Sequence, residues 1–256
     1  MKHLTIHGRK LEYRDLPATR AEAPTILLLH EGLGCVAMWR KFPEQLAEAT
    51  GSRVIVWSRA GYGGSEPYGE ARTPRYMHRE ALEELPAFAD ALGIEQAVLV
   101  GHSDGGSIAL IHAGAFPERV LGVAVMAPHE FVEEETLSGI REALAVWNNS
   151  DLPAKLGRYH PDVQRVFHDW ADSWLSPAFR DWNIEEYLPA IRCPVLAIQG
   201  EDDEYATMRQ IDAIAEQIAG TRLLKLSACG HSPHKDQPAA VLDALASFVG
   251  ALAVCA

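Results

Sequence analysis

Short apolar runs alternate along this chain with segments whose apolar residues recur at helical spacing. Short runs bounded by glycine, proline or charged residues are typical of strands that are buried on both faces of a sheet. Such runs occupy residues 25–30, 53–57, 97–100, 120–126, 194–199 and 222–226. A weakly alternating segment, residues 3–16, predicts a leading hairpin that turns at Gly8.

Helical segments separate these runs. We predict helices at residues 39–50, 76–92, 107–116, 207–218 and 238–252. Gly51 and Gly93 follow the first two, where a glycine commonly ends a helix. The regular alternation of strand and helix indicates an α/β fold, with a mostly parallel central sheet that is flanked by helices on both faces.

The alternation stops after Pro128 and resumes at Cys193. The stretch between them contains no predicted strand and is helical, charged and rich in tryptophan. Its tryptophans are Trp147, Trp170, Trp174 and Trp182. We expect residues 1–128 and 193–256 to form one core, with residues 129–192 inserted as a helical cap over the strand ends, where α/β proteins bind their ligands.

The composition is that of an ordinary globular protein, because 48% of the 256 residues are hydrophobic and 23% are charged. A net charge of −12 argues against nucleic acid and anionic membranes as partners. The first residues form no signal-like apolar run, and no segment reaches the length of a membrane span. We expect a cytoplasmic monomer or homodimer that acts on a small molecule.

The cysteines and histidines give no sign of a metal site. Cys35, Cys193, Cys229 and Cys255 are widely spaced, so we expect buried free thiols. The histidines lack metal-binding spacing, and the glycine-rich residues 61–65 lack the lysine of a phosphate-binding loop. We therefore predict neither a metal nor a cofactor.

One stretch carries the chemistry. A predicted strand runs into Gly101-His102-Ser103-Asp104-Gly105 and then into a predicted helix. Gly-x-Ser-x-Gly between a strand and a helix is the nucleophile elbow, a strained turn that exposes a serine hydroxyl. Gly101 and Gly105 fit this tight turn because they have no Cβ. The Asp104 N–H, at the start of the helix, would face a developing oxyanion.

A serine nucleophile needs a histidine base and a carboxylate that orients the histidine. Both occur here in the chain order of an elbow-type enzyme, which is serine, acid, histidine. Asp202 and Asp203 follow one predicted strand, and His231 and His234 follow the next. Because parallel strands end at the same edge of a sheet, both loops would lie beside Ser103.

Together the motifs resemble the α/β-hydrolase superfamily over the full length of the chain. They are His30-Glu-Gly-Leu-Gly34, Gly101-His-Ser-Asp-Gly-Gly106, Gly200-Glu-Asp-Asp203 and Gly230-His231. The resemblance implies Asp203 as the acid, with Asp202 as the alternative. It implies His231 as the base, with His234 as the alternative.

The loop at residues 30–34 departs from the family pattern, because Glu31 stands where the first glycine of His-Gly-x-x-Gly is common. Matching by position implies the Gly32 N–H as the second oxyanion donor and leaves Leu33 as the alternative. The sequence leaves open whether the Glu31 side chain faces the site.

The Ser-Asp-Gly-Gly elbow and the tryptophan-bearing cap most resemble the biphenyl-hydrolase-like serine hydrolases, the group that includes valacyclovirase. Members of that group cleave α-amino-acid esters, and the acid after their nucleophile binds the substrate ammonium. This implies the same role for Asp104, although a helix dipole stabilises an acid at this position whatever the substrate. Glu31, Trp147 and Trp174 are further candidate substrate contacts, although most cap tryptophans are expected to be packing anchors.

We therefore predict a serine hydrolase that cleaves a carboxylic ester through an acyl-enzyme, with an α-aminoacyl ester as one candidate substrate. The same triad suits a carbon–carbon hydrolase of vinylogous diketones or an enol-lactone hydrolase. A non-catalytic ligand-binding protein on the same fold is the alternative from a different class.

Overall fold

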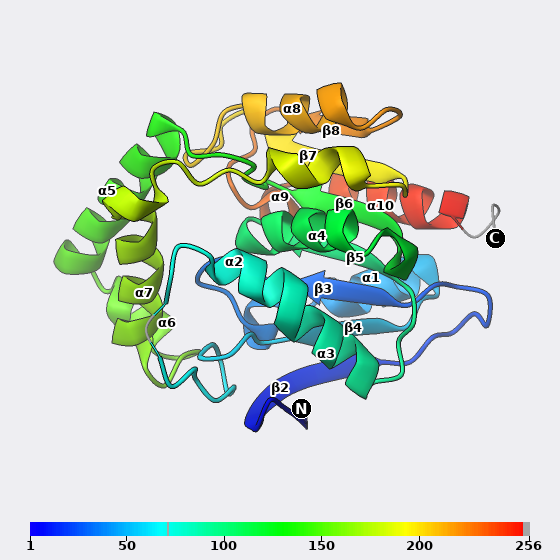
Figure 1. The fold of residues 1–256 in the computed structure, drawn as a ribbon, viewed down its shortest axis with the longest axis horizontal. Coiled ribbons are helices and arrows are strands. Elements are labelled where there is room, and N and C mark those ends of the chain that lie inside the picture. The colour runs from blue at the N-terminus through cyan, green and yellow to red at the C-terminus, as the bar shows by residue number, and fades with distance from the viewer. Residues whose placement is uncertain (71, 253–256) are drawn as a thin grey trace.

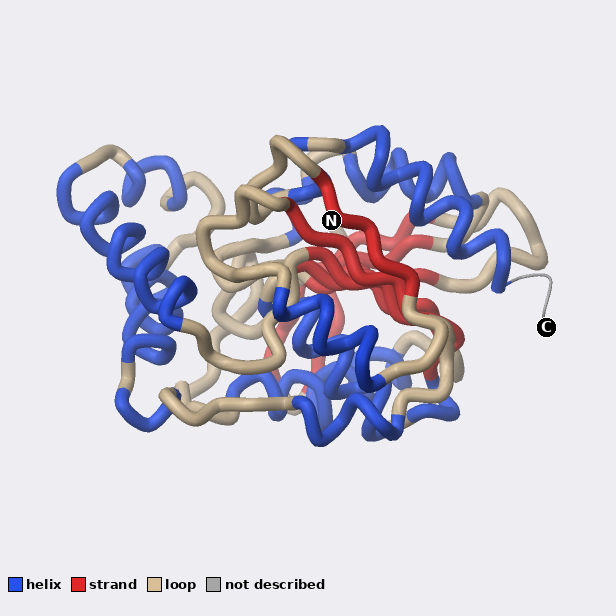
Figure 2. Tube along the Cα trace, turned by 90° about the horizontal axis from the view of Figure 1, so that it is seen from above, coloured by secondary structure: helices blue, strands red, loops and turns tan. Residues whose placement is uncertain are grey.

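The computed structural model describes residues 1–70 and 72–252. Its centre is an eight-stranded sheet in the order β1-β2-β4-β3-β5-β6-β7-β8, shown in Figure 1 and, from above, in Figure 2. The strands are β1 (Lys2–Ile6), β2 (Arg9–Leu16), β3 (Ile26–Leu29), β4 (Val54–Trp57), β5 (Ala97–His102), β6 (Val120–Met126), β7 (Val195–Gly200) and β8 (Arg222–Leu226). β2 pairs antiparallel with β1 and β4, and all other pairs are parallel. Every predicted strand and the mostly parallel sheet are confirmed.

The predicted hairpin at Gly8 is also confirmed. Ile6 pairs with Arg9 across a two-residue turn, and φ is 48° at His7 and 77° at Gly8. Two consecutive positive φ values belong to a type I′ turn, whose twist matches that of the flanking strands. Glycine adopts such a φ without steric cost.

Helices cover both faces of the sheet (Figure 1). One face packs against α1 (Phe42–Thr50) and α10 (Pro238–Leu252), and the other against α2 (Tyr76–Arg79), α3 (Leu85–Ala91), α4 (Asp104–Ala115) and α8 (Arg209–Gln217). Alternation along a strand divides its side chains between these faces. In β3, Ile26 and Leu28 join one apolar cluster, whereas Leu27 and Leu29 join the other. This is why the central strands are apolar throughout.

The starts of α1, α4 and α8 differ from the prediction, and α8 begins at Arg209 rather than at residue 207. A 3₁₀ turn (Val36–Trp39) precedes α1, which begins at Phe42 rather than at residue 39. α4 begins at Asp104, directly after Ser103, so it starts earlier than predicted. The predicted stop at Gly51 is confirmed, since its φ is 72° and its N–H donates to the Ala47 carbonyl at 2.8 Å.

The predicted helix at 76–92 contains a π-helical turn (Glu80–Glu84) between α2 and α3. Pro86 explains the turn, because proline has no N–H to donate and its ring displaces the carbonyls of the preceding turn. The Ala81 carbonyl accepts a hydrogen bond from His112 Nδ1 on α4 at 2.8 Å. A side chain from a neighbouring helix thus satisfies part of the interrupted backbone.

Residues 129–192 contain helices and no strand, apart from one isolated bridge between Phe131 and Asn183. The helices are α5 (Glu134–Asn149), α6 (Leu152–Leu156) and α7 (Val163–Leu175), and 3₁₀ turns follow at Pro177–Phe179 and Glu185–Ala190. Outside this segment, a further 3₁₀ turn (Pro117–Arg119) precedes β6. In Figure 1, α5, α6 and α7 stand together beyond one end of the sheet. We refer to residues 129–192 as the cap.

The cysteines within the described residues are free thiols. Cys35 and Cys229 are buried and Cys193 is partly buried, whereas Cys255 lies outside the described residues. Across residues 1–70 and 72–252, no helix combines the length and the apolar character that crossing a membrane requires.

Candidate active site

Ser103 lies on a tight turn between β5 and α4. Its φ is 52° and its ψ is −122°, a strained conformation for a residue with a side chain. A Cβ on Gly101 would collide with the Gly105 carbonyl, and a Cβ on Gly105 would collide with the Leu29 carbonyl. Both glycines are therefore required by close backbone approach, as the sequence predicts for an elbow.

The structure brings Ser103, His231 and Asp203 together. His231 Nε2 lies 2.9 Å from Ser103 Oγ, and His231 Nδ1 lies 2.8 and 3.0 Å from the two carboxylate oxygens of Asp203. The carboxylate accepts the Nδ1–H, so Nε2 is left with a lone pair that accepts the Ser103 hydroxyl proton. This arrangement can activate a serine for nucleophilic attack.

The loops that carry the acid and the histidine follow β7 and β8. The His231 N–H donates to Glu204 Oε2 at 3.1 Å, and the His231 carbonyl accepts from His102 Nε2 at 2.7 Å. His102 belongs to the elbow itself. The elbow therefore fixes the backbone of His231 as well as presenting Ser103 to its ring.

The alternative residues lie elsewhere. Asp202 is exposed to solvent. His234, on the short helix α9 (Pro233–Asp236), is buried against the rings of Trp39 and Phe42, at centroid distances of 4.9 and 5.3 Å. Neither residue takes part in the hydrogen bonds between Ser103, His231 and Asp203.

Asp203 stays ionised at neutral pH. Burial acts to raise its pKa, but the hydrogen bond and charge of His231 outweigh this, together with the Tyr205 N–H, which donates to Asp203 Oδ1 at 2.9 Å. The net result is a pKa below the ordinary value. A permanent negative charge behind His231 stabilises the imidazolium that proton transfer creates.

Ser103 opens into a cavity between the core and the cap, with a volume of about 530 Å³ that includes space open to solvent. Gly32 and Leu33 line it on the core side, and Trp170 lines it on the cap side. A Cβ on Gly32 would overlap the Trp170 indole, so the close approach of the cap requires glycine there. Asp104 is the first residue of α4, and an N–H at this position has no partner within its helix.

A family model of the alpha/beta hydrolase fold matches residues 24–164, more than half of the chain. The chain belongs to the α/β-hydrolase family. The Mus musculus protein "Serine hydrolase BPHL" is 27% identical over 187 residues, which are 71% of this chain and 64% of that protein. The chain therefore spans less than two thirds of that relative's length.

Two further matches extend over more of the chain. The 2-hydroxymuconate semialdehyde hydrolase of Pseudomonas sp. (strain CF600) is 28% identical over 242 residues, covering 85% of this chain and 83% of that protein. A solved structure from work on carboxylesterases of Nitrososphaera gargenis superimposes with a TM-score of 0.79 at 20% identity, covering 100% of both chains. The family model and the structural match confirm the fold, and the similarity to Serine hydrolase BPHL confirms the resemblance to biphenyl-hydrolase-like proteins.

In this α/β hydrolase Glu31 faces the cavity, which answers the question that the sequence leaves open. Its carboxylate oxygens lie 3.6 Å from His102 Nδ1 and 3.6 Å from Lys235 Nζ. Burial acts to raise the pKa of Glu31, but its interaction with His102 and the charge of Lys235 hold it well below the ordinary value. Glu31 therefore carries a charge at the cavity wall, and its contact with a substrate stays a prediction.

Of the two cap tryptophans that are predicted to contact the substrate, one lines the cavity and the other does not. Trp174 lines the cavity, and its Nε1–H donates to the Tyr76 hydroxyl at 3.1 Å. Trp147 does not line it, which corrects the prediction. Its ring stacks on Phe167 within the cap, with centroids 4.0 Å apart and planes inclined by 12°. Trp147 is a packing residue because α5 places its ring against Phe167 and His168 on α7.

Asp104 is buried, with 1% of its surface exposed, and only one of its carboxylate oxygens is occupied. Oδ2 accepts from the Tyr76 hydroxyl at 2.8 Å and lies 3.6 Å from Arg59 Nη2. Oδ1 has no hydrogen-bond partner among the described residues. One acceptor of a buried carboxylate is therefore left free beside Ser103.

His129 and Thr136 also line the cavity, although neither belongs to a motif that points to this site. His129 Nε2 faces the Tyr205 carbonyl at 3.3 Å, which assigns the proton to Nε2 and leaves Nδ1 as an acceptor. Burial and the charge of His231 lower the pKa of His129 to about 4, so the ring is neutral at pH 7. Within the described residues, His129 Nδ1 and Thr136 Oγ1 are both buried without a partner.

The described residues contain no group of three or more His, Cys, Asp or Glu side chains placed to hold a metal ion.

Proposed function

We propose that this α/β hydrolase cleaves carboxylic esters through an acyl-enzyme. The observation that carries the proposal is the hydrogen-bond chain from Ser103 Oγ to His231 Nε2, at 2.9 Å, and from His231 Nδ1 to Asp203, at 2.8 Å. It stands at the wall of a cavity large enough for a small acyl group.

Each group has one role in the proposed reaction. Ser103 Oγ attacks the ester carbonyl carbon and gives its proton to His231 Nε2, while Asp203 stabilises the imidazolium. The N–H groups of Asp104 and Gly32 hold the tetrahedral oxyanion. Its collapse expels the alcohol, which takes the proton from His231. Water then attacks the acyl-enzyme with His231 again as base, and the acid leaves from Ser103.

We further propose that the acyl part carries an α-amino group. Buried polar groups without partners are costly, so a ligand that supplies the missing hydrogen bonds gains affinity. Asp104 Oδ1 and His129 Nδ1 are acceptors, and an ammonium offers three donors. The buried Arg59 lies near the occupied oxygen and offsets part of the Asp104 charge. The substrate ammonium is therefore recognised through the hydrogen bonds that it donates as well as through its positive charge.

A matched kinetic pair tests this proposal. An α-aminoacyl ester and its N-acetyl analogue are compared on the wild type and on Asp104→Asn, which keeps the shape and an acceptor for Tyr76. We expect the free amine to be preferred about 10- to 100-fold in kcat/KM, a preference that the variant loses. Equal rates for the two esters would leave a general esterase and would refute the ammonium subsite.

The similarity to the Pseudomonas 2-hydroxymuconate semialdehyde hydrolase, which covers 85% of this chain, favours carbon–carbon bond hydrolysis as the second candidate. The same serine, histidine and acid would serve that reaction. A vinylogous diketone assayed beside the ester panel separates the two. A kcat/KM for the diketone above that of every ester would reverse our preference.

A further inference from the structure

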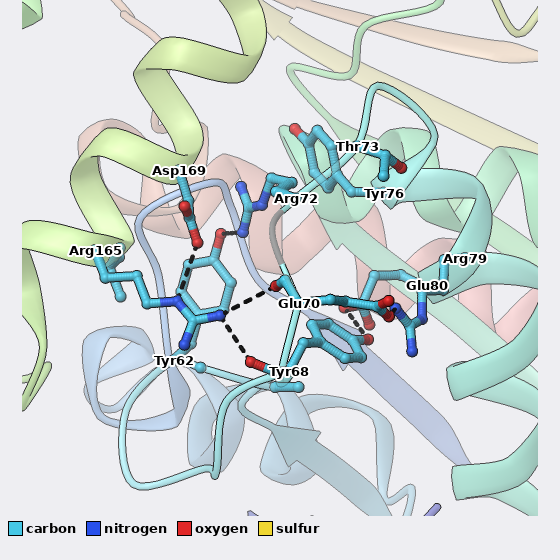
Figure 3. A pocket seen from close by; sticks show the side chains of 13 residues that line it. Tyr62, Tyr68, Glu70, Arg72, Thr73, Tyr76, Arg79, Glu80, Arg165 and Asp169 are labelled. Carbon is cyan, nitrogen blue, oxygen red and sulfur yellow. Dashed lines mark hydrogen bonds and ion pairs between the residues drawn. The ribbon is translucent and has the colours of Figure 1, made fainter.

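A second cavity lies beside the cap, next to the one that contains Ser103. It encloses about 690 Å³, partly open to solvent, between the loop that follows β4, helix α2 and the cap helix α7. Figure 3 shows Tyr62, Arg72 and Tyr76 reaching into it from the core side and Arg165 and Asp169 from α7. Its size is typical of small-molecule sites.

The two cavities are separate. Among the described residues, none lines both of them. Tyr76 stands between them, since its ring lines the second cavity while its hydroxyl bonds with Asp104 and Trp174, which line the first. A ligand in the second cavity would therefore not occupy the space above Ser103.

Three arginines line the second cavity, and two of them are neutralised locally. Arg79 pairs with Glu70, and Arg165 Nε lies 3.3 Å from Asp169 Oδ2. Arg72 differs. No carboxylate among the described residues lies within 4.0 Å of its guanidinium. Among the described residues that line the cavity, Arg72 is therefore the arginine that forms no ion pair within 4.0 Å.

The contacts of Arg72 leave one donor nitrogen free. Its Nη2 donates to the Tyr62 hydroxyl, as Figure 3 shows. Its guanidinium carbon lies 4.4 Å from the Tyr76 ring centroid and 5.4 Å from that of Tyr62. Nη1 is buried and has no hydrogen-bond partner within residues 1–70 and 72–252. The ring faces attract the charge but accept no hydrogen bond of normal strength from Nη1.

A guanidinium does not escape this cost by losing its proton, because it stays charged at any physiological pH. An anionic acceptor would accept a hydrogen bond from the free donor and form an ion pair with the guanidinium. The neighbouring carboxylates limit the size of that negative charge, since Glu70, Glu80 and Asp169 line the same cavity. They repel a dianion more strongly than a monoanion.

We propose that the second cavity binds a small organic carboxylate, held by Arg72 Nη1. The aliphatic side chains of Ala60 and Val166 line the cavity and supply contacts for the carbon part of such an acid. The Tyr68 ring is less available to a ligand, because the guanidinium carbons of Arg9 and Arg79 already lie 4.6 and 4.0 Å from its centroid. The site is therefore suited to a compact acid rather than to a stacked aromatic plane.

Titration calorimetry with acetate, benzoate and inorganic phosphate at constant ionic strength tests the proposal. The proteins are the wild type, Arg72→Gln, Arg72→Lys and a control, Arg75→Gln, whose side chain is exposed outside the lining. We expect acetate to bind most tightly. Arg72→Gln should weaken it about 10- to 100-fold, and Arg75→Gln should leave it unchanged. Weak general accumulation of anions is disfavoured by the net charge of −12, so saturable binding reports a site.

Arg72→Lys keeps the charge but loses the planar donor set, so its affinity should lie between those of the wild type and Arg72→Gln. If the glutamine variant does not fold, as its unfolding temperature will show, the lysine variant decides alone. No acetate binding by the wild type would overturn the proposal. Equal losses in the Arg72 and Arg75 variants, or tighter binding of phosphate than of acetate, would do the same.

Discussion

Replacing Asp203 by asparagine tests the proposed role of the carboxylate behind His231. Asp203 Oδ1 accepts from the Tyr205 N–H at 2.9 Å and lies 2.8 Å from His231 Nδ1, and Oδ2 lies 3.0 Å from the same Nδ1. An asparagine keeps its amide oxygen on the Tyr205 N–H, because an NH₂ group there would face another donor. The NH₂ group therefore takes the place of Oδ2, where it would face the Nδ1–H donor to donor, so it favours the tautomer in which His231 Nδ1 accepts its hydrogen bond.

This exchange reverses the tautomer of His231. With Nδ1 accepting, the ring proton moves to Nε2, which lies 2.9 Å from Ser103 Oγ and then no longer accepts the hydroxyl proton. The side chain of residue 203 is 1% exposed, so water does not replace the lost charge. We expect kcat to fall about 10⁴-fold, which corresponds to about 5 kcal/mol in the activation barrier.

Steady-state rates on an ester that the wild type hydrolyses measure this effect, and circular dichroism confirms that the variant is folded. Asp202→Asn is the matched control, since Asp202 is the exposed neighbour and its loss should change kcat less than about threefold. An Asp203→Asn variant within about tenfold of the wild type would refute the reasoning. An equally severe effect of Asp202→Asn would mean that Asp202, and not Asp203, is the acid that orients His231.

Two further predictions concern stability. Glu130 is fully buried with both carboxyl oxygens unpartnered among the described residues, and burial followed by the charges of Glu185 and Glu133 raises its pKa well above the ordinary value. Its raised pKa contributes stability that is complete below the ordinary carboxyl pKa and is lost as pH rises toward the folded-state pKa. Glu130→Gln should remove this loss of stability. Parallel plots of unfolding temperature against pH for the two proteins would contradict the prediction. In urea denaturation, Gly105→Ala should lower the free energy of unfolding by about 3 kcal/mol, because the new Cβ collides with the Leu29 carbonyl. Gly250→Ala on α10 is the control: its Cβ would meet no atom within 4 Å, so the change should be neutral or slightly stabilising. Equal effects of the two substitutions would exclude the steric argument.

Much of the fold is predictable from sequence because the signals for it are local. The apolar strands end at glycine or polar loops, and in a mostly parallel sheet these ends gather at one edge. Ser103, Asp203 and His231 each follow such a strand end, so their meeting follows from topology. The requirement for Gly101 and Gly105 is also local, since both are close to the turn that they permit.

The cap side of the cavity could not be predicted in this way. Helical spacing places Trp147 and Trp174 on apolar faces but does not say which neighbour each face meets. Trp147 meets Phe167 inside the cap, whereas Trp174 meets Tyr76 from the core. That difference depends on how α5 and α7 pack, which is a tertiary property.

The polar residues of the cavity were missed for a related reason. His129 and Thr136 are ordinary polar residues in sequence, and their significance comes from burial without partners. The free nitrogen of Arg72 is likewise visible only once Tyr62 and Tyr76 are seen to enclose it. A sequence motif reports the residues that act on the reacting bond, but it does not report which hydrogen bonds the fold leaves unmade.

Labelling with a fluorophosphonate tests the central claim most directly. Such a probe phosphonylates a serine that a histidine activates, and peptide mass spectrometry locates the adduct. We expect one adduct per chain, on Ser103, that is absent from Ser103→Ala and forms much more slowly in Asp203→Asn. Folded wild-type protein that stays unlabelled, or that is labelled at another serine, would contradict the account and favour a ligand-binding protein on the same fold.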